Sequence, residues 1–455
     1  MSAHDVVIIG GGPGGYLAAE RLGAAGKTVL LVEKAALGGT CLNVGCIPTK
    51  ALLNSAKLYL HAREGEKFGV KAEGLSYDWT AMQAWKSEVT EKLRNAIALT
   101  EKKLGVQVLQ AEARLIGPGR VEAAGEIREA AAIIVATGSA PVMPPIPGAR
   151  DNPKVLDSTG LLSIPEVPKS LCVIGGGVIG VEFAGLFAAL GSKVEVVEML
   201  DEIVPFMDKE QAPVLRRAMK GVSFKLGCKV ERIELSSVVY RAKDGSEARC
   251  DADLVLMAVG RRPVVDGFGA KEAGLDCGPK GVAVDERMRT NLPGVWAVGD
   301  VTGKSLLAHS AYRMAEVAVA DILSAGASAR EGNVMRYDAV PWAVYGMPEA
   351  AGVGLTEQEA LSRGIAVKKA SLPARVSGRF CAENGFAAQG SVKVVADAHD
   401  GRILGVHVVG AYASEMIWGG AALIEQELRA SDVKQIVFPH PTVCEVIRDA
   451  VWELE

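Results

Sequence analysis

The sequence predicts an α/β protein built from two copies of one strand–helix–strand unit, followed by a segment in which strands and helices alternate. The main observation is a repeat: VIIGGGPGG at residues 7–15 returns as CVIGGGVIG at residues 172–180. The offset of 165 residues continues downstream, where Glu33 corresponds to Glu198. The second observation is the length of 455 residues, enough for two to four domains. A repeat at such a distance is one supersecondary unit used twice rather than a solenoid, so we expect two related domains.

The composition excludes several classes of protein. The net charge of −4 argues against a general nucleic-acid binder and against a polybasic membrane anchor. The sequence has no run of about 18 apolar residues, so we expect no membrane span. The first residues lack a basic region before an apolar run, so we expect no secretory signal and a cytoplasmic protein. Eight cysteines in so long a chain do not form a disulfide scaffold, and any close pair is a candidate for redox or metal chemistry.

Each copy of the repeat predicts the same three elements. A short apolar run is typical of a buried parallel strand, and the alanine-rich stretch behind the glycine turn predicts a helix. A second, β-branched run then ends at an acidic residue, which completes a right-handed βαβ unit. The expected strands are 6–9, 28–32, 171–174 and 193–197, and the expected helices are 16–25 and 181–190.

Beyond the repeats the pattern is less regular. Four prolines between residues 141 and 147 form a linker-like cluster between the two copies, and the small, polar stretch from Ser324 to Asn333 marks a further boundary. Strands are expected at 132–136, 254–259, 295–298, 391–395 and 403–409, and helices at 308–323, 414–427 and 443–451.

The first glycine loop, Gly10-x-Gly12-x-x-Gly15, predicts a dinucleotide site. Its first glycine allows a tight turn, its second lets a pyrophosphate approach the backbone, and its third lets helix and strand pack closely. The phosphates would lie at a helix N-terminus, where free N–H groups and the helix dipole favour negative charge. Glu33, 23 residues after Gly10, stands where a carboxylate accepts hydrogen bonds from a ribose. The alternative, a glycine-rich turn without a ligand, does not explain the strand, the helix and the acid together.

The second loop, Gly175-x-Gly177-x-x-Gly180, has Glu198 at the same spacing. An acid at this point suits the free ribose hydroxyls of NAD, whereas an NADP site calls for a nearby arginine. The three residues after Glu198, Met-Leu-Asp, include no cation. The second unit is therefore expected to bind NAD, although Glu198 alone would also fit a solvated acid at the end of a strand.

Cys41 and Cys46 are the candidate redox pair. No further ligands at zinc-site spacing stand nearby. A regular helix would hold the two Cα atoms about 8.7 Å apart, whereas a disulfide needs less than about 7 Å. A disulfide therefore requires a distorted first turn, which Gly45 permits. A small strained ring beside a nucleotide site is typical of a catalytic disulfide, and two unlinked core thiols are the alternative.

With these residues in place the chain resembles the dihydrolipoamide dehydrogenases, within the class I pyridine nucleotide-disulfide oxidoreductases. The segment 39–50, GTCLNVGCIPTK, matches the redox motif of that family almost residue for residue. Other matching motifs are ATGS at 136–139, VGRRP at 259–263 and AVGD at 297–300. The resemblance extends over nearly the whole chain. It implies two Rossmann-like dinucleotide-binding domains, for FAD and NAD, and an α+β dimerisation domain at the C-terminus. The implied ranges are 1–145 and 271–334 for the two parts of the FAD domain, 146–270 for the NAD domain and 335–455 for the interface domain.

The resemblance also implies a reaction and its residues. Dihydrolipoamide would be oxidised at a Cys41–Cys46 disulfide, with Cys41 exchanging with the substrate and Cys46 facing the flavin. Hydride would then pass from FAD to NAD. The partners would be a second copy of the chain, in an obligate homodimer, and lipoylated proteins of 2-oxo acid dehydrogenase complexes or of the glycine cleavage system.

A histidine near the C-terminus is the expected base. His440 opens the segment His-Pro-Thr-Val-Cys-Glu, and Glu445 would orient it and stabilise its cation. A dithiol must lose protons before it can reduce a disulfide, and imidazole titrates in a suitable range. By resemblance this segment reaches the active site of the partner subunit, and Lys50 and Glu182 form a further pair beside the flavin. The alternatives are a surface-loop histidine and, for Glu182, an ordinary first-turn acid.

The remaining residues implied to contact a cofactor follow from the matching motifs. For FAD and the redox segment they are Gly10, Gly12, Pro13, Gly14, Gly15, Glu33, Lys34, Gly39, Thr40, Lys50, Ala113, Thr137, Gly138, Gly299, Asp300 and Ala308; for NAD they are Gly175, Gly177, Val178, Ile179, Gly180, Glu182, Glu198, Val230 and Gly260.

Three features depart from the usual pattern: Cys444 stands in place of a serine, Pro439 stands in place of an alanine, and the segment GMPE at 346–349 differs slightly from the usual interface motif. Rival enzymes fit less well. A glutathione reductase would need a basic NADP site, and a mercuric reductase or a large thioredoxin reductase would need a redox-active C-terminal tail, which the ending VWELE lacks. Another NADH-dependent flavin disulfide reductase and a non-catalytic flavin-binding redox sensor remain as alternatives.

Overall fold

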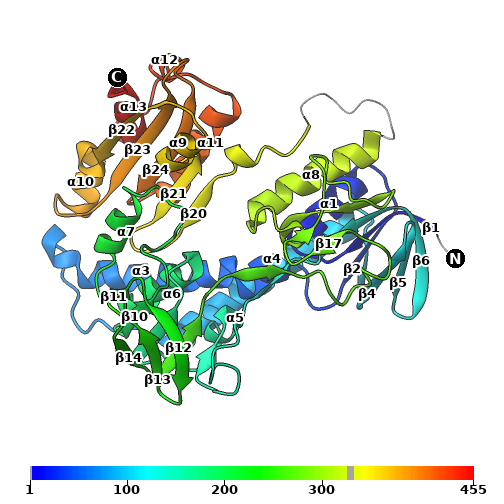
Figure 1. The fold of residues 1–455 in the computed structure, drawn as a ribbon, viewed down its shortest axis with the longest axis horizontal. Coiled ribbons are helices and arrows are strands. Elements are labelled where there is room, and N and C mark those ends of the chain that lie inside the picture. The colour runs from blue at the N-terminus through cyan, green and yellow to red at the C-terminus, as the bar shows by residue number, and fades with distance from the viewer. Residues whose placement is uncertain (1–2, 325–332, 455) are drawn as a thin grey trace. The chain divides into compact units, whose positions relative to one another are not determined.

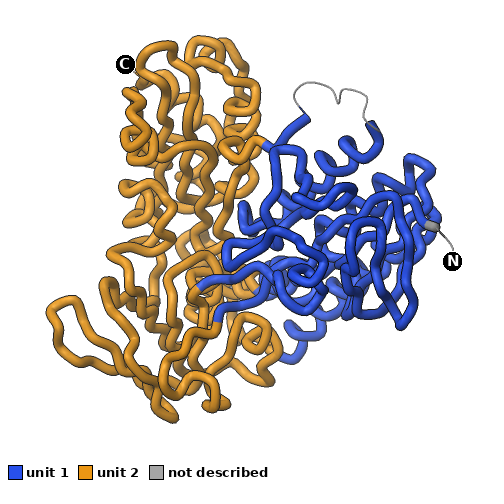
Figure 2. Tube along the Cα trace, turned by 45° about the vertical axis from the view of Figure 1, so that its right-hand side comes forward, with its two compact units in different colours: residues 1–52, 80–142, 260–335 blue, residues 53–79, 143–259, 336–455 orange. Residues whose placement is uncertain are grey.

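The fold was determined as a computed structural model that describes residues 3–324 and 333–454. The chain divides into two compact units, each made of three stretches of sequence (Figure 2). Unit 1 comprises residues 1–52, 80–142 and 260–335, and unit 2 comprises residues 53–79, 143–259 and 336–455. Among the described residues, no helix is both long and apolar enough to cross a membrane.

Unit 1 is organised around one sheet of seven strands, ordered β3-β2-β1-β6-β5-β4, with β19 also paired to β6. Strands β1, β2, β3, β6 and β19 are parallel. Strands β1 and β2 and the second half of β6 are rich in buried aliphatic side chains, because helices cover a parallel sheet. The antiparallel β4 and β5 extend the sheet beyond the first half of β6. The strands are β1 (Ala3–Ile9), β2 (Val29–Glu33), β3 (Gln107–Gln110), β4 (Ala113–Gly117), β5 (Arg120–Ala123), β6 (Glu126–Val135) and β19 (Val295–Ala297).

Two helices pack side by side in unit 1, α1 (Pro13–Ala24) and α8 (Ala308–Ser324) (Figure 1). The first part of the redox segment forms α2 (Gly39–Val44), which is followed at once by α3 (Cys46–Arg63). A long helix, α4 (Trp79–Lys103), connects to β3.

Unit 2 contains the second copy of the repeat in a sheet of five parallel strands, ordered β11-β10-β9-β15-β8. Helix α6 (Val178–Ala189) connects β9 to β10, as α1 connects β1 to β2. The strands are β8 (Val155–Leu156), β9 (Ser170–Ile174), β10 (Lys193–Val197), β11 (Val222–Lys225) and β15 (Leu254–Met257). A three-stranded antiparallel meander, which sequence analysis missed, follows: β12 (Lys229–Glu234), β13 (Ser237–Arg241) and β14 (Glu247–Asp251).

The C-terminal part of unit 2 is an antiparallel sheet ordered β20-β21-β24-β23-β22, with helices packed on it (Figure 1). Helix α11 (Ala413–Glu425) contacts β21 and β24, and α13 (Glu445–Trp452) contacts β22 and β23. Both helices place apolar side chains in the same core as the strands. The strands are β20 (Trp342–Val344), β21 (Ala350–Gly354), β22 (Val367–Pro373), β23 (Ser391–Asp397) and β24 (Ile403–Val409).

Shorter elements complete both units. They are β7 (Ser139–Pro141), β16 (Arg261–Pro263), β17 (Cys277–Gly278), β18 (Gly281–Val282), α5 (Ser158–Leu161), α7 (Ala212–Ala218), α9 (Glu357–Ser362), α10 (Gly378–Asn384), α12 (Ala430–Val433) and the 3-10 turns η1 (Gly65–Phe68), η2 (Gly299–Thr302), η3 (Tyr337–Ala339) and η4 (Ala374–Val376).

The predicted fold class is confirmed: two related βαβ units and an α+β segment are present. The two helices of the repeat start three residues earlier than predicted, at Pro13 and Val178, because Gly12 and Gly177 are their N-cap residues. The last glycines of both loops therefore lie inside the first turn of a helix. The boundary placed at 324–333 lies outside the described residues except at its ends, and the division into four segments stays a prediction.

Candidate functional site

The first glycine loop has the conformation that a dinucleotide site needs. Gly10 has φ +106°, and a Cβ there would lie 2.3 Å from the Ala136 carbonyl oxygen. A Cβ at Gly15 would lie 1.8 Å from the Gly10 carbonyl oxygen. Only glycine fits these two positions. Gly10 has a left-handed backbone conformation, and at Gly15 the helix packs too closely against the end of the preceding strand to leave room for a side chain. At Gly12 the nearest atom to a Cβ would be the Gly39 Cα at 3.8 Å, so the backbone remains accessible.

The second loop repeats this geometry almost atom for atom. Gly175 has φ +108°, and its Cβ would lie 2.5 Å from the Ala258 carbonyl oxygen. The Cβ of an alanine at Gly180 would lie 2.0 Å from the Gly175 carbonyl oxygen. Around Gly177 a Cβ would meet nothing within 4 Å. The two loops therefore present the same open backbone to a ligand.

The acid that closes each unit folds back onto its own loop. Glu33 accepts hydrogen bonds from the Gly11 N–H (2.7 Å) and the Ala35 N–H (2.7 Å). Glu198 accepts them from the Gly176 N–H (2.6 Å) and the Leu200 N–H (2.7 Å). Each carboxylate is thus fixed beside its loop. Its oxygens keep further lone pairs that can accept hydrogen bonds from ribose hydroxyls.

These features fit a dinucleotide at each loop. Neither N-cap glycine carries a side-chain cap, so the first-turn N–H groups of α1 and α6 are available to a pyrophosphate. No arginine or lysine contacts the Glu198 carboxylate in the hydrogen bonds of the described residues. Lys243 does reach the turn after Glu198, a contact that sequence analysis missed, but it is paired with Asp201 at 2.7 Å. The second loop therefore fits NAD better than NADP.

The two cysteines lie at a break between helices. Helix α2 ends at Val44, Gly45 has φ −144° and ψ −110°, and α3 begins at Cys46. A Cβ at Gly45 would lie 2.9 Å from the Thr40 carbonyl oxygen, so the backbone is distorted at this glycine, as a disulfide between the two cysteines would require. The structure describes both cysteines as thiols. The hydrogen bond between Cys41 and Cys46 and burial both raise the pKa of the Cys41 thiol, while the charge of Lys50 lowers it.

The start of the redox segment touches the first loop directly. A Cβ at Gly39, which has φ +57°, would lie 2.6 Å from the Gly12 Cα. Asn43 reinforces this arrangement by donating to the Leu37 and Gly39 carbonyl oxygens, both at 2.9 Å. The cysteine pair is therefore held beside the dinucleotide loop of unit 1.

Asp300 belongs to a small polar network in unit 1. Ser139 donates to its carboxylate at 2.5 Å, and Arg261 donates to the Ser139 hydroxyl at 2.9 Å. Burial raises the pKa of Asp300, and the Ser139 hydrogen bond and the Arg261 charge oppose this shift. The network connects three motifs of the resemblance, ATGS, VGRRP and AVGD.

His440 and Glu445 form a base–orienter pair in unit 2. The His440 Nδ1 and the Glu445 Oε1 are 2.8 Å apart, and the Glu445 Oε2 accepts the Thr442 N–H at 2.9 Å. The Thr442 N–H holds the pKa of Glu445 below its usual range, and His440 contributes in the same direction. The His440 side chain is 80% exposed while that of Glu445 is 12% exposed, so an oriented imidazole faces outward. Cys444 contacts the Thr442 hydroxyl at 3.0 Å.

The other predicted residues are spread over both units. Glu182 is 4% exposed in α6 and accepts the Tyr345 N–H at 3.0 Å. Its pairing with Lys50, which belongs to the other unit, stays a prediction. The Thr137 hydroxyl donates to the Val264 carbonyl oxygen at 2.8 Å. Val178 and Ile179 begin α6, Ala308 begins α8, Thr40 lies in α2, Ala113 begins β4, Val230 lies in β12, Lys34 follows β2, and Gly138, Gly260 and Gly299 have positive φ.

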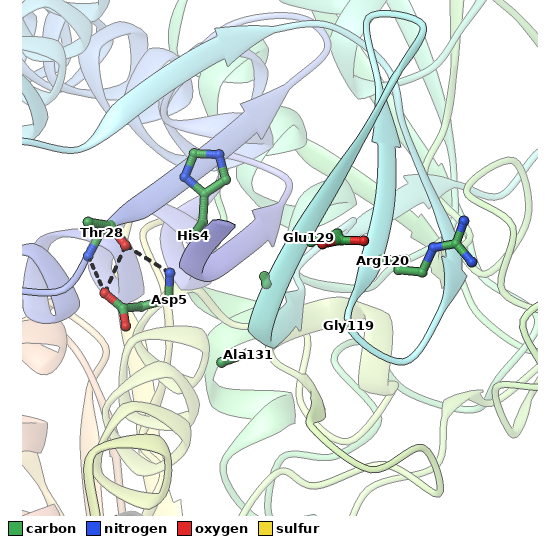
Figure 3. Close-up of a pocket in the computed structure, with 8 residues that line it drawn as sticks. His4, Asp5, Thr28, Gly119, Arg120, Glu129 and Ala131 are labelled. Carbon is green, nitrogen blue, oxygen red and sulfur yellow. Dashed lines mark hydrogen bonds between the residues drawn. The ribbon is translucent and has the colours of Figure 1, made fainter. Parts of the chain in front are cut away.

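A hollow of about 530 Å³ in unit 1 is lined by none of these residues. It is lined by residues at the amino ends of β1 and β2 and by the β5–β6 region, including His4, Thr28 and Arg120 (Figure 3). The glycine loop leaves β1 at its carboxyl end, where ligands of parallel sheets bind. The hollow therefore carries none of the predicted chemistry. The described residues contain no group of three or more histidine, cysteine or acidic side chains suited to a metal ion.

Sequence analysis missed one arrangement close to the cysteines. Tyr16 of α1 and Tyr312 of α8 share a hydrogen bond between their hydroxyls, although they are 296 residues apart. Neither motif spacing nor periodicity signals such a contact, since it depends on the packing of two distant helices.

Comparisons with known proteins agree with this geometry. Residues 4–315 match the pyridine nucleotide-disulphide oxidoreductase family, and residues 340–451 match its dimerisation domain. The chain is 41% identical to a dihydrolipoyl dehydrogenase of Thermus scotoductus, over 100% of this chain and 98% of the relative. It is 40% identical to dihydrolipoyl dehydrogenase 3 of Pseudomonas putida, over 100% and 99%.

Solved structures give the same result. LpdA of Mycobacterium tuberculosis superposes with a TM-score of 0.88 at 27% identity, covering 99% of each chain. RclA of Escherichia coli, an HOCl-induced flavoprotein disulfide reductase, superposes with a TM-score of 0.87 at 30% identity, covering 99% of this chain and 100% of RclA. With the loops, the cysteine pair and the outward-facing histidine already described, these matches assign the chain to the pyridine nucleotide-disulphide oxidoreductase family, as a flavoprotein disulfide reductase.

Proposed function

We propose that this reductase is a dihydrolipoyl dehydrogenase, which oxidises dihydrolipoamide on lipoylated proteins and reduces NAD⁺. The observation that supports this most is the combination of a cysteine pair at a helix break with an exposed histidine fixed by a carboxylate. The relatives named dihydrolipoyl dehydrogenase align over the whole chain, which supports the same substrate class.

The proposed chemistry at sulfur balances as two thiol–disulfide exchanges. One dihydrolipoamide sulfur attacks the Cys41 Sγ, breaks the Cys41–Cys46 bond and forms a mixed disulfide. The second substrate sulfur then attacks the first, releases lipoamide and leaves both cysteines reduced. The substrate loses two electrons and two protons in this sequence.

The role of His440 is to accept a proton from the substrate thiol. Its Nδ1 is directed at Glu445, so its Nε2 is left for the substrate, and the carboxylate stabilises the cation that forms. A matching dimerisation domain supports a homodimer in which this imidazole serves the cysteine pair of the partner subunit.

The cofactors would be held by the two loops. The Gly10–Gly15 loop and Glu33 would bind FAD, with Asp300 and the segment beginning at Ala308 at the flavin end, and the Gly175–Gly180 loop and Glu198 would bind NAD. Bound FAD supplies the two-electron relay between a dithiol and a nicotinamide. Lys50 provides a positive charge that lowers the pKa of the Cys41 thiol and thereby favours the reactive thiolate.

The test is steady-state turnover of the purified flavoprotein with dihydrolipoamide and NAD⁺, and in reverse with lipoamide or glutathione disulfide and NADH or NADPH. We expect NADH–lipoamide turnover to dominate. Flavin reduction by NADH without lipoamide turnover would contradict the substrate and favour another disulfide. Failure of NADH to reduce the flavin would favour a non-catalytic flavoprotein.

His440→Gln tests the base. We expect turnover with dihydrolipoamide to fall at least about a hundredfold, because general-base catalysis contributes that much or more. His399→Gln is the matched control, since His399 is an exposed histidine of the same unit. Equal turnover in the two variants would contradict the role of His440.

A further inference from the structure

The Tyr16–Tyr312 pair has a fixed geometry inside unit 1. The two hydroxyls are hydrogen-bonded to each other, and the rings meet edge to face with centroids 6.0 Å apart and an interplanar angle of 67°. Both side chains are half-buried. Tyr16 lies in the first turns of α1, and Tyr312 lies in those of α8. Because these two helices pack side by side, each tyrosine is positioned by its own helix.

The pair lies beside the redox cysteines. Gly39 and Gly12 touch, which places the first turn of α2, with Cys41, against the first turn of α1, with Tyr16. Negative charge on Cys41 raises the pKa of Tyr16, after the larger effects of burial and of the Tyr312 hydroxyl. Cys41 and Cys46 both raise the pKa of Tyr312, for which burial is the largest cause. The phenols and the thiols are therefore close enough to influence each other's charge.

Counting protons shows what the pair can do. Two phenols carry two O–H protons, and the bond between them uses one. Whichever phenol donates, the other keeps a proton that can be donated outside the pair. Because their pKa values are raised above the ordinary value of 10, both phenols keep these protons at neutral pH.

The Cys41 sulfur is a group that needs such a donor. Its hydrogen bond with Cys46 and its burial both make ionisation harder, and Lys50 offsets this only in part. A hydrogen bond donated to a thiolate favours the charged form and lowers the pKa of the thiol. Glu20, a half-buried carboxylate of α1, also acts on both phenols and is the competing acceptor.

We propose that Tyr16 and Tyr312 act as a positioning pair that donates one hydrogen bond to the Cys41 thiolate after the disulfide has been reduced. This inference rests on the proposed role of Cys41 as the thiol that exchanges with substrate. The hydrogen bond stabilises the thiolate and holds its sulfur in one orientation. The two cysteines are thereby made different, because the phenol donates its hydrogen bond to Cys41 and not to Cys46.

The test measures the thiol and not turnover. The reduced full-length protein is alkylated with iodoacetamide across a pH series, and the rate at Cys41 is followed by peptide mass spectrometry. In the double variant Tyr16→Phe/Tyr312→Phe we expect the pKa of the Cys41 thiol to rise, so that the alkylation rate below that pKa falls about tenfold, as expected when a charge-assisted hydrogen bond is lost. Of the single variants, the one that removes the phenol facing Cys41 should show the same fall, and the other should show a smaller one, because its remaining phenol still has a proton to donate.

The matched control is Tyr77→Phe. Tyr77 forms an edge-to-face pair with Tyr59 and donates its hydroxyl to the Leu190 carbonyl oxygen at 3.1 Å, and its pKa is raised by burial and by Tyr59 rather than by a cysteine. This variant should leave the Cys41 profile unchanged. The same reaction in denaturant gives the unfolded reference, and coincidence of a tyrosine variant with that reference would identify a folding defect, which the remaining single variant then circumvents.

Two outcomes separate the inference from the proposed function. If the double variant and both single variants alkylate Cys41 with the wild-type pH profile, the pair is structural or donates to Glu20, and the inference is wrong. If the profile of the double variant shifts but the wild-type protein does not oxidise dihydrolipoamide, the inference stands and the substrate assignment is wrong. With both correct, the double variant should have a lower kcat and an unchanged KM for NAD⁺.

Discussion

The two copies of the repeat have the same loops and different surroundings. Gly10 and Gly175 have similar φ values of +106° and +108°. Glu33 accepts the Gly11 N–H, and Glu198 accepts the Gly176 N–H. At the same offset, however, Tyr16 corresponds to Val181 and Glu20 to Gly185. The backbone conformation that suits a dinucleotide is thus kept in both copies, while the tyrosine that we propose to act on Cys41 occurs only in the first.

The two copies are also anchored by different forces. In the first copy the first turn of α1 packs against apolar groups, since a Cβ at Gly14 would meet Val298 at 3.0 Å and Ala311 at 3.6 Å. In unit 2 the chain after β10 is tied to β23 through charges. There Lys393 contacts Asp208 (3.0 Å), Glu210 (3.0 Å) and Glu357 (2.6 Å), and the Lys393 and Asp208 side chains are fully buried.

This difference suits the two ligands that we propose. The redox segment lies against the first loop, where a Cβ at Gly12 would meet the Gly39 Cα at 3.8 Å, whereas a Cβ at Gly177 would meet no atom of the described residues within 4 Å. A loop with a neighbouring segment suits a resident cofactor such as FAD, and a loop without one suits a nucleotide that enters and leaves at each turnover. The charged cluster would hold the chain after β10 against β23 and leave the Gly175–Gly180 loop uncovered.

Lys393→Met tests the charged anchor and should have the largest effect. Removal of the ammonium leaves the buried Asp208 carboxylate without its cation, which costs about 3–5 kcal/mol of stability in comparable cases. We expect this loss in urea unfolding followed by circular dichroism. Lys369→Met is the control, because Lys369 contacts two of the same carboxylates but is 41% exposed, and it should cost less than about 1 kcal/mol. Equal losses would mean that apolar packing anchors both copies.

Gly177→Ala tests whether the second loop is an open nucleotide site. A methyl group there meets no protein atom within 4 Å, and the backbone has φ −73°, so the melting temperature should stay nearly unchanged. We expect NADH to bind about tenfold more weakly, because the methyl group occupies the space that a pyrophosphate approaches. Gly175→Ala, at φ +108° with a carbonyl oxygen 2.5 Å away, should instead destabilise the protein. Unchanged NADH affinity in Gly177→Ala would place the nucleotide elsewhere.

Glu101→Gln tests a feature confined to the first copy, whose expected effect is on the pH dependence of stability. Glu101 of α4 is fully buried, neither of its carboxylate oxygens has a hydrogen-bond partner among the described residues, and burial together with Glu20 raises its pKa to about 8. Between its unfolded pKa near 4.5 and about 8, the folded protein holds a proton that the unfolded chain releases. Stability therefore falls as pH rises through this window, by up to about 1.4 kcal/mol per pH unit.

The glutamine variant should flatten this part of the pH dependence when unfolding is measured from pH 5 to pH 9. Glu91→Gln, at an exposed position of the same helix, is the control and should keep the wild-type slope. A slope that survives in Glu101→Gln would show that another group holds the proton.

Much of the site could be predicted because its signals are local. The spacing of glycines around Gly10 and Gly175, the acids that close each unit, and the break at Gly45 each depend on backbone conformation over a few residues. The helix starts were misplaced because the same glycines serve both the turn and the first helical turn. The meander β12–β14 was missed since its short, charged strands have weak periodicity.

By itself the sequence determined the two βαβ units, their glycine loops, the acids Glu33 and Glu198 and the cysteine spacing, because covalent neighbours limit the conformations available there. Only the tertiary structure decided which distant side chains meet: Tyr16 with Tyr312, 296 residues apart, Lys393 with Asp208, 185 residues apart, and Glu101 in a site without partners. These contacts depend on how whole helices and strands pack, and burial then changes the pKa and hydrogen bonding of groups whose local sequence gives no sign of it.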